Sequence, residues 1–218
     1  MKQITNDVEL SYSIIKEKDH IIYQKGEKKI EIPSNFIIKE FPVLSSNEAI
    51  TEYFGIVFEQ PIYVGEEQEV KLYVKLPLDI GIYVSDGSNY KLIDVIEIYT
   101  KKYALYGTIG EGVIYRYWKT NAYLERPIHS ANEALTLIEI INKAGSIGSV
   151  SKIIFNSKFF SLYFKDEKFY GEIIRVTRLQ KGLALVRPIN KPTIEGAEII
   201  PTTVSKGIGG QFEMRFGT

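Results

Sequence analysis

The sequence contains no cysteine and only two histidines among its 218 residues. Without cysteine there are no disulfides, no thiolate nucleophiles and no cysteine-ligated zinc or iron–sulfur sites. His20 and His129 lie far apart, and neither has a neighbour at a metal-binding spacing such as HxH or HExxH. We therefore interpret both as surface residues and expect no metal and no cofactor. The lack of cysteine also favours a reducing, cytoplasmic location.

The sequence has no excess of either charge and no long apolar run. Lys and Arg total 27, as do Asp and Glu, so the formal net charge is zero. Proteins that bind nucleic acid usually carry a basic excess, so we do not expect nucleic acid as a partner. No segment reaches the roughly 18 uncharged apolar residues of a membrane helix, and the first residues lack the apolar core of a secretory signal. We expect a soluble protein that is not embedded in a membrane.

What the sequence does contain is alternation with a period of two. In Val70–Leu76, four aliphatic residues lie on one face of an extended chain, and Lys71, Tyr73 and Lys75 lie on the other. These residues are mainly β-branched and aromatic types, which pack well in sheets. The same pattern predicts strands in six further segments: 8–14, 55–58, 92–98, 112–118, 173–179 and 212–216.

Turn signals separate these segments at short intervals. They lie at residues 25–27, 86–89 and 165–168, and the Asp86-Gly87 pair is the strongest of them. Counted this way, sixteen to eighteen short strands fill the chain. The pattern therefore predicts an all-β fold of two packed antiparallel β-sandwich-like units, with at most one or two short helices.

Two segments compete as helices. Residues 45–53 open with capping residues and are long enough for one or two turns. Residues 131–141 fit either a helix or a strand, and we favour a strand that runs through a hairpin loop at 142–146 into a strand at 150–155. A proline and polar residues near Pro127 interrupt the pairing pattern. We therefore expect an N-terminal unit at 1–126 and a C-terminal unit at 127–218.

The densest cluster of aromatic and basic residues lies between Tyr99 and Tyr123. Aromatic rings next to cations are common anchors of binding surfaces. On a strand, Tyr115 and Tyr117 share one face, and Arg116 and Trp118 share the other with Ile114. Alternatively, one aromatic face belongs to the core. If the cluster is a surface, replacing Trp118 and Arg116 removes binding and leaves the thermal midpoint intact. The candidate binding residues are Tyr103, Tyr106, Tyr115, Arg116, Tyr117, Trp118 and Lys119.

No arrangement of residues in the sequence identifies a catalytic site. There is no GxSxG nucleophile elbow, and the glycine-bearing loop at 107–112 leads into a strand, which favours a hairpin over a phosphate cradle. A pair of carboxylates has no characteristic spacing, so a carboxylate-based enzyme or a carbohydrate-binding protein stays open as an alternative. A weaker alternative is single-stranded nucleic-acid binding through aromatic stacking. The candidate carboxylates are Asp79, Asp94, Glu97, Glu111 and Glu125.

Several segments together resemble a known family. The segments are 58–64, 76–84, 102–107, 112–119 and 150–156, and the most specific is the Leu-Tyr-Gly to Arg-Tyr-Trp-Lys block within 105–119. From about Phe58 onward the chain resembles an archaeal domain-of-unknown-function family, number 432. The resemblance implies a strand at 134–141 and an archaeal, cytoplasmic protein, and it assigns no catalytic residue. It also implies a membrane channel as a partner to test, through a loose association with genes for small mechanosensitive channels.

These observations favour a non-enzymatic protein-interaction module over an enzyme. No catalytic motif is found in the sequence, and its charge is balanced. The cluster of aromatic and basic residues suits a binding surface.

Overall fold

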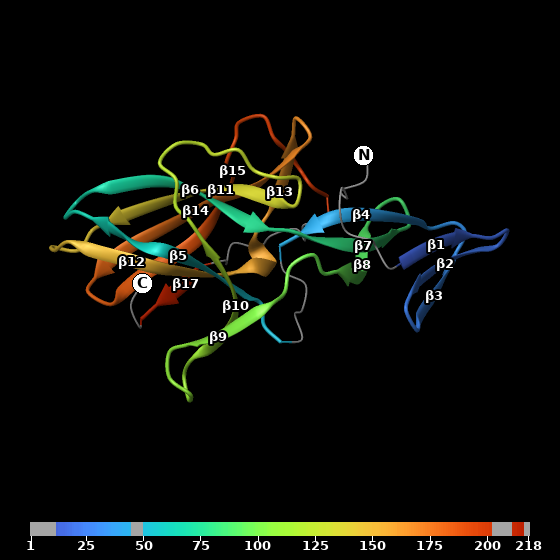
Figure 1. The fold of residues 1–218 in the computed structure, drawn as a ribbon, viewed down its shortest axis with the longest axis horizontal. Coiled ribbons are helices and arrows are strands. Elements are labelled where there is room, and N and C mark those ends of the chain that lie inside the picture. The colour runs from blue at the N-terminus through green and yellow to red at the C-terminus, as the bar shows by residue number, and fades with distance from the viewer. Residues whose placement is uncertain (1–11, 45–49, 202–210, 216–218) are drawn as a thin grey trace.

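The computed structural model describes residues 12–44, 50–201 and 211–215. Seventeen strands in these ranges form four sheets, and the single helix among the described residues is a short 3-10 helix, η1 (Ser157–Phe159). This confirms the all-β fold class. Figure 1 shows an elongated molecule with the first three strands at one end and the largest sheets at the other.

Two small antiparallel sheets form one half of the molecule. Sheet A has the order β1-β2-β3, and sheet B has the order β4-β7-β8. The predicted turns at 25–27 and 86–89 connect β2 to β3 and β7 to β8, as expected. The strands are β1 (Tyr12–Lys16), β2 (His20–Lys25), β3 (Lys28–Pro33), β4 (Ile37–Val43), β7 (Asp79–Ser85) and β8 (Tyr90–Ile96). The buried residues between the sheets are Ile21, Tyr23, Ile32, Ile80, Ile82 and Ile96.

Two larger sheets form the other half. Sheet C has the order β12-β5-β10-β9. Sheet D has the order β16-β13-β14-β11-β6, with β15 pairing with both β14 and β17. The strands of sheet C are β5 (Tyr53–Val64), β9 (Lys102–Tyr106), β10 (Val113–Thr120) and β12 (Gly148–Asn156). The strands of sheet D are β6 (Glu69–Pro77), β11 (Glu133–Asn142), β13 (Leu162–Lys165), β14 (Lys168–Gln180), β15 (Leu183–Pro192), β16 (Glu198–Ile199) and β17 (Phe212–Met214).

The alternation seen in the sequence produces the core. On β6, Leu72, Val74 and Leu76 are buried in the main cluster, as the period-two pattern predicts. The same cluster continues to Phe41 and Tyr83 of sheet B. Sheet B therefore has apolar residues on both faces, one toward sheet A and one toward the main core.

The sheets are mainly antiparallel, as predicted, but β10 pairs with β5 and β11 pairs with β14 in parallel. One predicted detail of pairing is wrong. The strands β11 and β12 do not form a hairpin: β11 pairs with β6 and β14, and β12 pairs with β5. The loop between β11 and β12 therefore passes from sheet D to sheet C. The side-chain amide of Asn142 holds it in place by donating to the carbonyls of Val64 and Gly65. Alternation identifies strands but not their partners, so it could not reveal either detail.

The ambiguous segment at 131–141 is a strand, β11, as favoured. For the helix predicted at 45–53, residues 45–49 lie outside the described residues, and Tyr53 begins β5. The pairs β6–β11 and β5–β12 join strands from either side of residue 126. A cut there would separate hydrogen-bonded neighbours, so the division into 1–126 and 127–218 stays a prediction about folding units. In the described part of the chain, no helix has the length and apolar character needed to span a membrane.

Candidate functional site

The region singled out in the sequence folds as the β9–β10 hairpin and the chain around it. In the antiparallel register, Tyr103 lies opposite Arg116, and Ala104 lies opposite Tyr115. Residues directly opposite share a face, and successive residues alternate between faces. The burial of the seven candidate residues does not follow the two faces alone: Tyr106, Tyr115 and Arg116 are buried, Tyr103, Tyr117 and Trp118 are partly buried, and Lys119 is exposed.

Tyr106 and Tyr115 belong to the main core. The ring of Tyr115 lies against Gly55, where an added Cβ would come within 2.3 Å of its Cδ2 atom. Tyr106 packs against Phe212, with 6.0 Å between ring centres. Burial raises the pKa of the Tyr115 hydroxyl. One aromatic face of the hairpin thus packs inward, which leaves the opposite face to be considered for binding.

Arg116 is an interior residue that joins sheets B and C. Its side chain is only 3% exposed, and Nη1 donates to Asp79 Oδ2 at 3.1 Å and to the Leu44 carbonyl at 3.0 Å. Asp79, the first residue of β7, is 1% exposed, and its Oδ1 accepts from the Ile98 amide at 2.9 Å. The charges of the pair compensate each other where water is excluded. This geometry gives Arg116 a structural task that the sequence pattern did not indicate.

Trp118 and Lys119 each have a partner within the protein. The Trp118 ring meets the Tyr99 ring edge-on, with centres 5.2 Å apart. Lys119 Nζ lies 2.7 Å from Glu59 Oε2 on the neighbouring strand β5. The basic charge at this exposed position is therefore already paired.

The face opposite Tyr106 and Tyr115, on which Arg116 is buried, also carries exposed apolar residues that the sequence analysis did not select. Leu105 lies directly opposite Ile114, and the two are 46% and 49% exposed. Tyr103 lies two residues from Leu105 on the same face, and we call Tyr103, Leu105 and Ile114 the hairpin face. Figure 1 shows the hairpin projecting away from the rest of the molecule, and Ile109 near its tip is 97% exposed. A signal for them was present in the sequence. If the loop at 107–112 closes a hairpin, alternation along its two strands places Leu105 and Ile114 on the face opposite that of Tyr106.

Strand β9 is also one of the two edge strands of sheet C, the other being β12. Two other sheet edges are covered: Lys25 and Lys28 donate to the carbonyls of Val95 and Ile93 on β8, and the edge of β6 forms a bridge with Tyr123. Such caps keep an edge strand from pairing with another chain. In the ranges that the structure describes, no comparable cap lies on residues 102–105 of β9.

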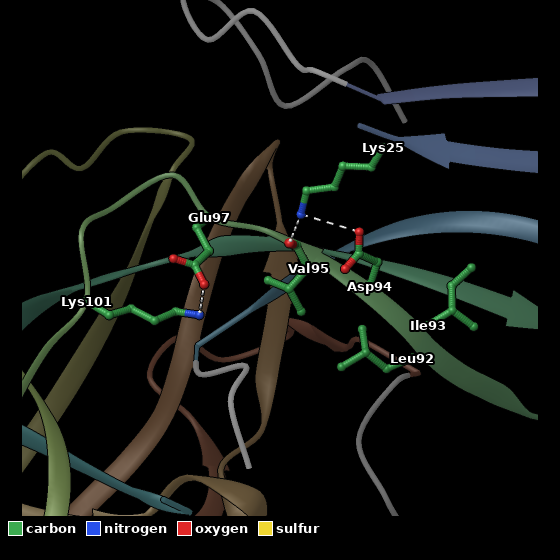
Figure 2. Close-up of a pocket in the computed structure, with 7 residues that line it drawn as sticks. All are labelled: Lys25, Leu92, Ile93, Asp94, Val95, Glu97 and Lys101. Carbon is green, nitrogen blue, oxygen red and sulfur yellow. Dashed lines mark hydrogen bonds and ion pairs between the residues drawn. The ribbon is translucent and has the colours of Figure 1, made fainter. Parts of the chain in front are cut away.

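A shallow pocket of about 360 Å³ lies along the outer edge of β8. Figure 2 shows that Lys25 reaches into it from sheet A, and that Glu97 and Lys101 face each other across its other side. Lys25 Nζ donates to the Val95 carbonyl at 2.7 Å and lies 3.3 Å from Asp94 Oδ2. The lining residues are Lys25, Leu92, Ile93, Asp94, Val95, Glu97 and Lys101. None of them is aromatic, so this pocket lacks the ring platform expected of a carbohydrate site.

The carboxylates of this pocket are engaged in ion pairs. Asp94 accepts from the Tyr23 hydroxyl at 2.6 Å and from Lys28 at 3.0 Å. Burial alone would raise the pKa of Asp94, but these hydrogen bonds and the nearby Lys25 charge outweigh it and lower the pKa. A general acid at neutral pH needs a raised pKa, so Asp94 does not suit that role. Its contacts instead fasten sheet A to sheet B.

His129 is buried, which corrects its interpretation as a surface residue. It is 6% exposed, its ring packs edge-on against Tyr170, and its Nε2 lies 2.9 Å from the Phe169 carbonyl. Because a carbonyl only accepts, Nε2 carries the proton. The connection at 121–132 folds back onto sheet D at this point. In the sequence, the nearby Pro127 indicated a break between strands but not that the chain after it would be buried. Among the described residues, no three His, Asp or Glu side chains come together to hold a metal ion.

Comparison with known proteins gives one relationship. No curated protein and no solved structure matches the chain. A family model described as "Protein of unknown function (DUF432)" matches residues 5–215. The match includes the N-terminal strands, where the resemblance seen in the sequence was weakest. Because this model covers almost the whole chain, the protein belongs to the DUF432 family of unknown function.

Proposed function

We propose that this protein is a non-enzymatic protein-interaction module that binds its partner through the β9–β10 hairpin. The observation that carries the proposal is the exposed pair Leu105 and Ile114 beside residues 102–105 of β9, on which no cap lies among the described residues. An extended segment of a partner can add to such an edge as a new strand. Its backbone then supplies hydrogen bonds, and the neighbouring side chains supply specificity.

The hairpin face suits a protein partner better than a small ligand. It is a projecting surface, whereas small-molecule sites are concave and bury most of the ligand. Leu105 and Ile114 are half exposed, so covering them would contribute roughly 1 kcal/mol each, about half the value for complete burial of such side chains. Partly exposed Tyr103 adds an aromatic ring of the kind enriched at interfaces.

The setting of the partner is part of the proposal. The absence of cysteine fits a reducing compartment, so we propose a cytoplasmic protein. Both a cytoplasmic protein and the cytoplasmic part of a membrane channel are then accessible partners. We therefore propose to test the membrane and soluble fractions of the host separately.

The test uses the immobilised protein to capture partners from both fractions, the membrane fraction being detergent-solubilised. Leu105→Glu places a charge on the hairpin face, and Leu124→Glu places the same charge on another exposed leucine (79% exposed) away from the hairpin. We expect a partner that the wild type and Leu124→Glu retain and Leu105→Glu loses. The purified partner should then bind with a Kd at least 30-fold weaker for Leu105→Glu, the factor of a hot-spot residue of about 2 kcal/mol. Equal binding by all three folded proteins would refute the proposal.

A further inference from the structure

We infer that the segment that pairs with β9 is β9 of a second copy of this chain, an inference that rests on the proposed function of the hairpin. Two copies would be related by a twofold axis that passes between their two Ala104 residues, with the two β9 strands antiparallel. The two four-stranded sheets C would then continue into one eight-stranded sheet. An isologous contact of this kind closes on itself and uses the same patch on both subunits.

The sequence of β9 is self-complementary in this register. With Ala104 opposite its own copy, Tyr103 of one chain lies opposite Leu105 of the other, and Lys102 lies opposite Tyr106. Opposite residues share a face, so each exposed leucine gains an aromatic neighbour. The two leucines become diagonal neighbours, roughly 7–8 Å apart, within reach of each other's side chains.

The charges on β9 also permit self-pairing. Lys102 is the one charged residue of the strand, and the proposed register keeps the two Lys102 side chains apart at opposite ends of the contact. Like charges placed directly opposite would destabilise the pair. The edges of β8 and β6 differ, since lysine side chains or a Tyr123 bridge already occupy their backbone groups. Self-pairing is thus favoured at β9 over these two edges.

The contact is small, which predicts a weak dimer. A strand of five residues and a few side chains bury less than the roughly 1,200 Å² of a standard stable interface. We therefore expect a monomer at low concentration and a dimer as the concentration rises into the high micromolar range. Sedimentation equilibrium of the full chain over a concentration series measures this directly.

The absence of cysteine from the wild-type chain allows a second test of the register. In Ala104→Cys, the new thiols of two copies would face each other across the twofold axis. Directly opposite Cβ atoms lie roughly 4.5–5.5 Å apart, and the lower end of this range meets the roughly 3.5–4.5 Å found in disulfides. We expect fast disulfide formation for this variant under mild oxidation. Ile109→Cys, at the exposed loop near the tip, lies away from the axis and serves as the control.

The outcomes separate the inference from the proposed function. Concentration-dependent dimerisation that Leu105→Lys abolishes and Leu124→Lys retains, with selective cross-linking at position 104, would support the inference. A monomer at all concentrations, a dimer unaffected by Leu105→Lys, or equal cross-linking of both cysteine variants would overturn it. A monomer whose capture of a different protein depends on Leu105 would overturn the second copy as the partner and leave the proposed function standing.

Discussion

Replacing Arg116 by alanine should destabilise the protein strongly, because Arg116 compensates a charge buried between sheets B and C. After the change, Asp79 keeps its hydrogen bond from the Ile98 amide but loses the ion pair with Arg116, and the Leu44 carbonyl loses a donor. Removing one member of a buried pair costs about 3–5 kcal/mol. For a chain of this size each kcal/mol shifts the midpoint by about 2–4 °C, so the midpoint should fall by about 6–20 °C.

The assay is thermal and urea unfolding of the wild type, Arg116→Ala, Asp79→Asn and the double variant Arg116→Met/Asp79→Asn. The double variant removes both charges and keeps an acceptor for the Ile98 amide, so it should be more stable than Arg116→Ala. A midpoint for Arg116→Ala within about 2 °C of the wild type would refute the reasoning. Such a result would also make Arg116 a candidate binding residue at the surface again.

Three further predictions concern packing and pH. Gly55→Ala should cost about 1–3 kcal/mol, because the new methyl would collide with the Tyr115 ring, whereas Gly110→Ala meets nothing within 4 Å and should be close to neutral in urea unfolding. Burial lowers the pKa of His129 below 6.5, so its contribution to stability is present above pH 6.5 and declines as the pH falls below it. His129→Gln should flatten the dependence of unfolding free energy on pH as the pH falls below 6.5, and an unchanged slope would contradict this. The lowered pKa of Asp94 means that its contribution is present above pH 3.8 and is lost as the pH falls through the folded value, so Asp94→Asn should reduce the acid dependence of unfolding there.

The sequence predicted local structure well because burial on one face imposes a period of two. The alternation at Val70–Leu76 became β6, and the turn residues at 86–89 connect β7 and β8. The segment at 131–141 was decided correctly as β11. Each of these strands and turns depends on residues that are neighbours in the sequence, so their positions can be predicted from the sequence alone.

The arrangement of strands depends on residues far apart, and there the sequence was less informative. The parallel neighbours β5 and β10 are separated in the sequence by strands β6 to β9, and the residues of neither strand indicate which strand it pairs with. The same limit affected the candidate site. Arg116 has the composition of a binding residue, and only the approach of Asp79 from another sheet makes it interior. Leu105 and Ile114 are of residue types typical of a core, and their exposure depends on which distant elements pack over the hairpin.

Hydrogen–deuterium exchange of the hairpin tests the central claim most directly, because it reports whether the edge of β9 is open and whether binding covers it. In dilute protein, the amides of residues 102–105 that point away from β10 should exchange rapidly. They should become protected when the partner is added or when the concentration is raised, and Leu105→Glu should prevent that protection. Protection that appears elsewhere on binding, with exchange in β9 unchanged, would contradict the account.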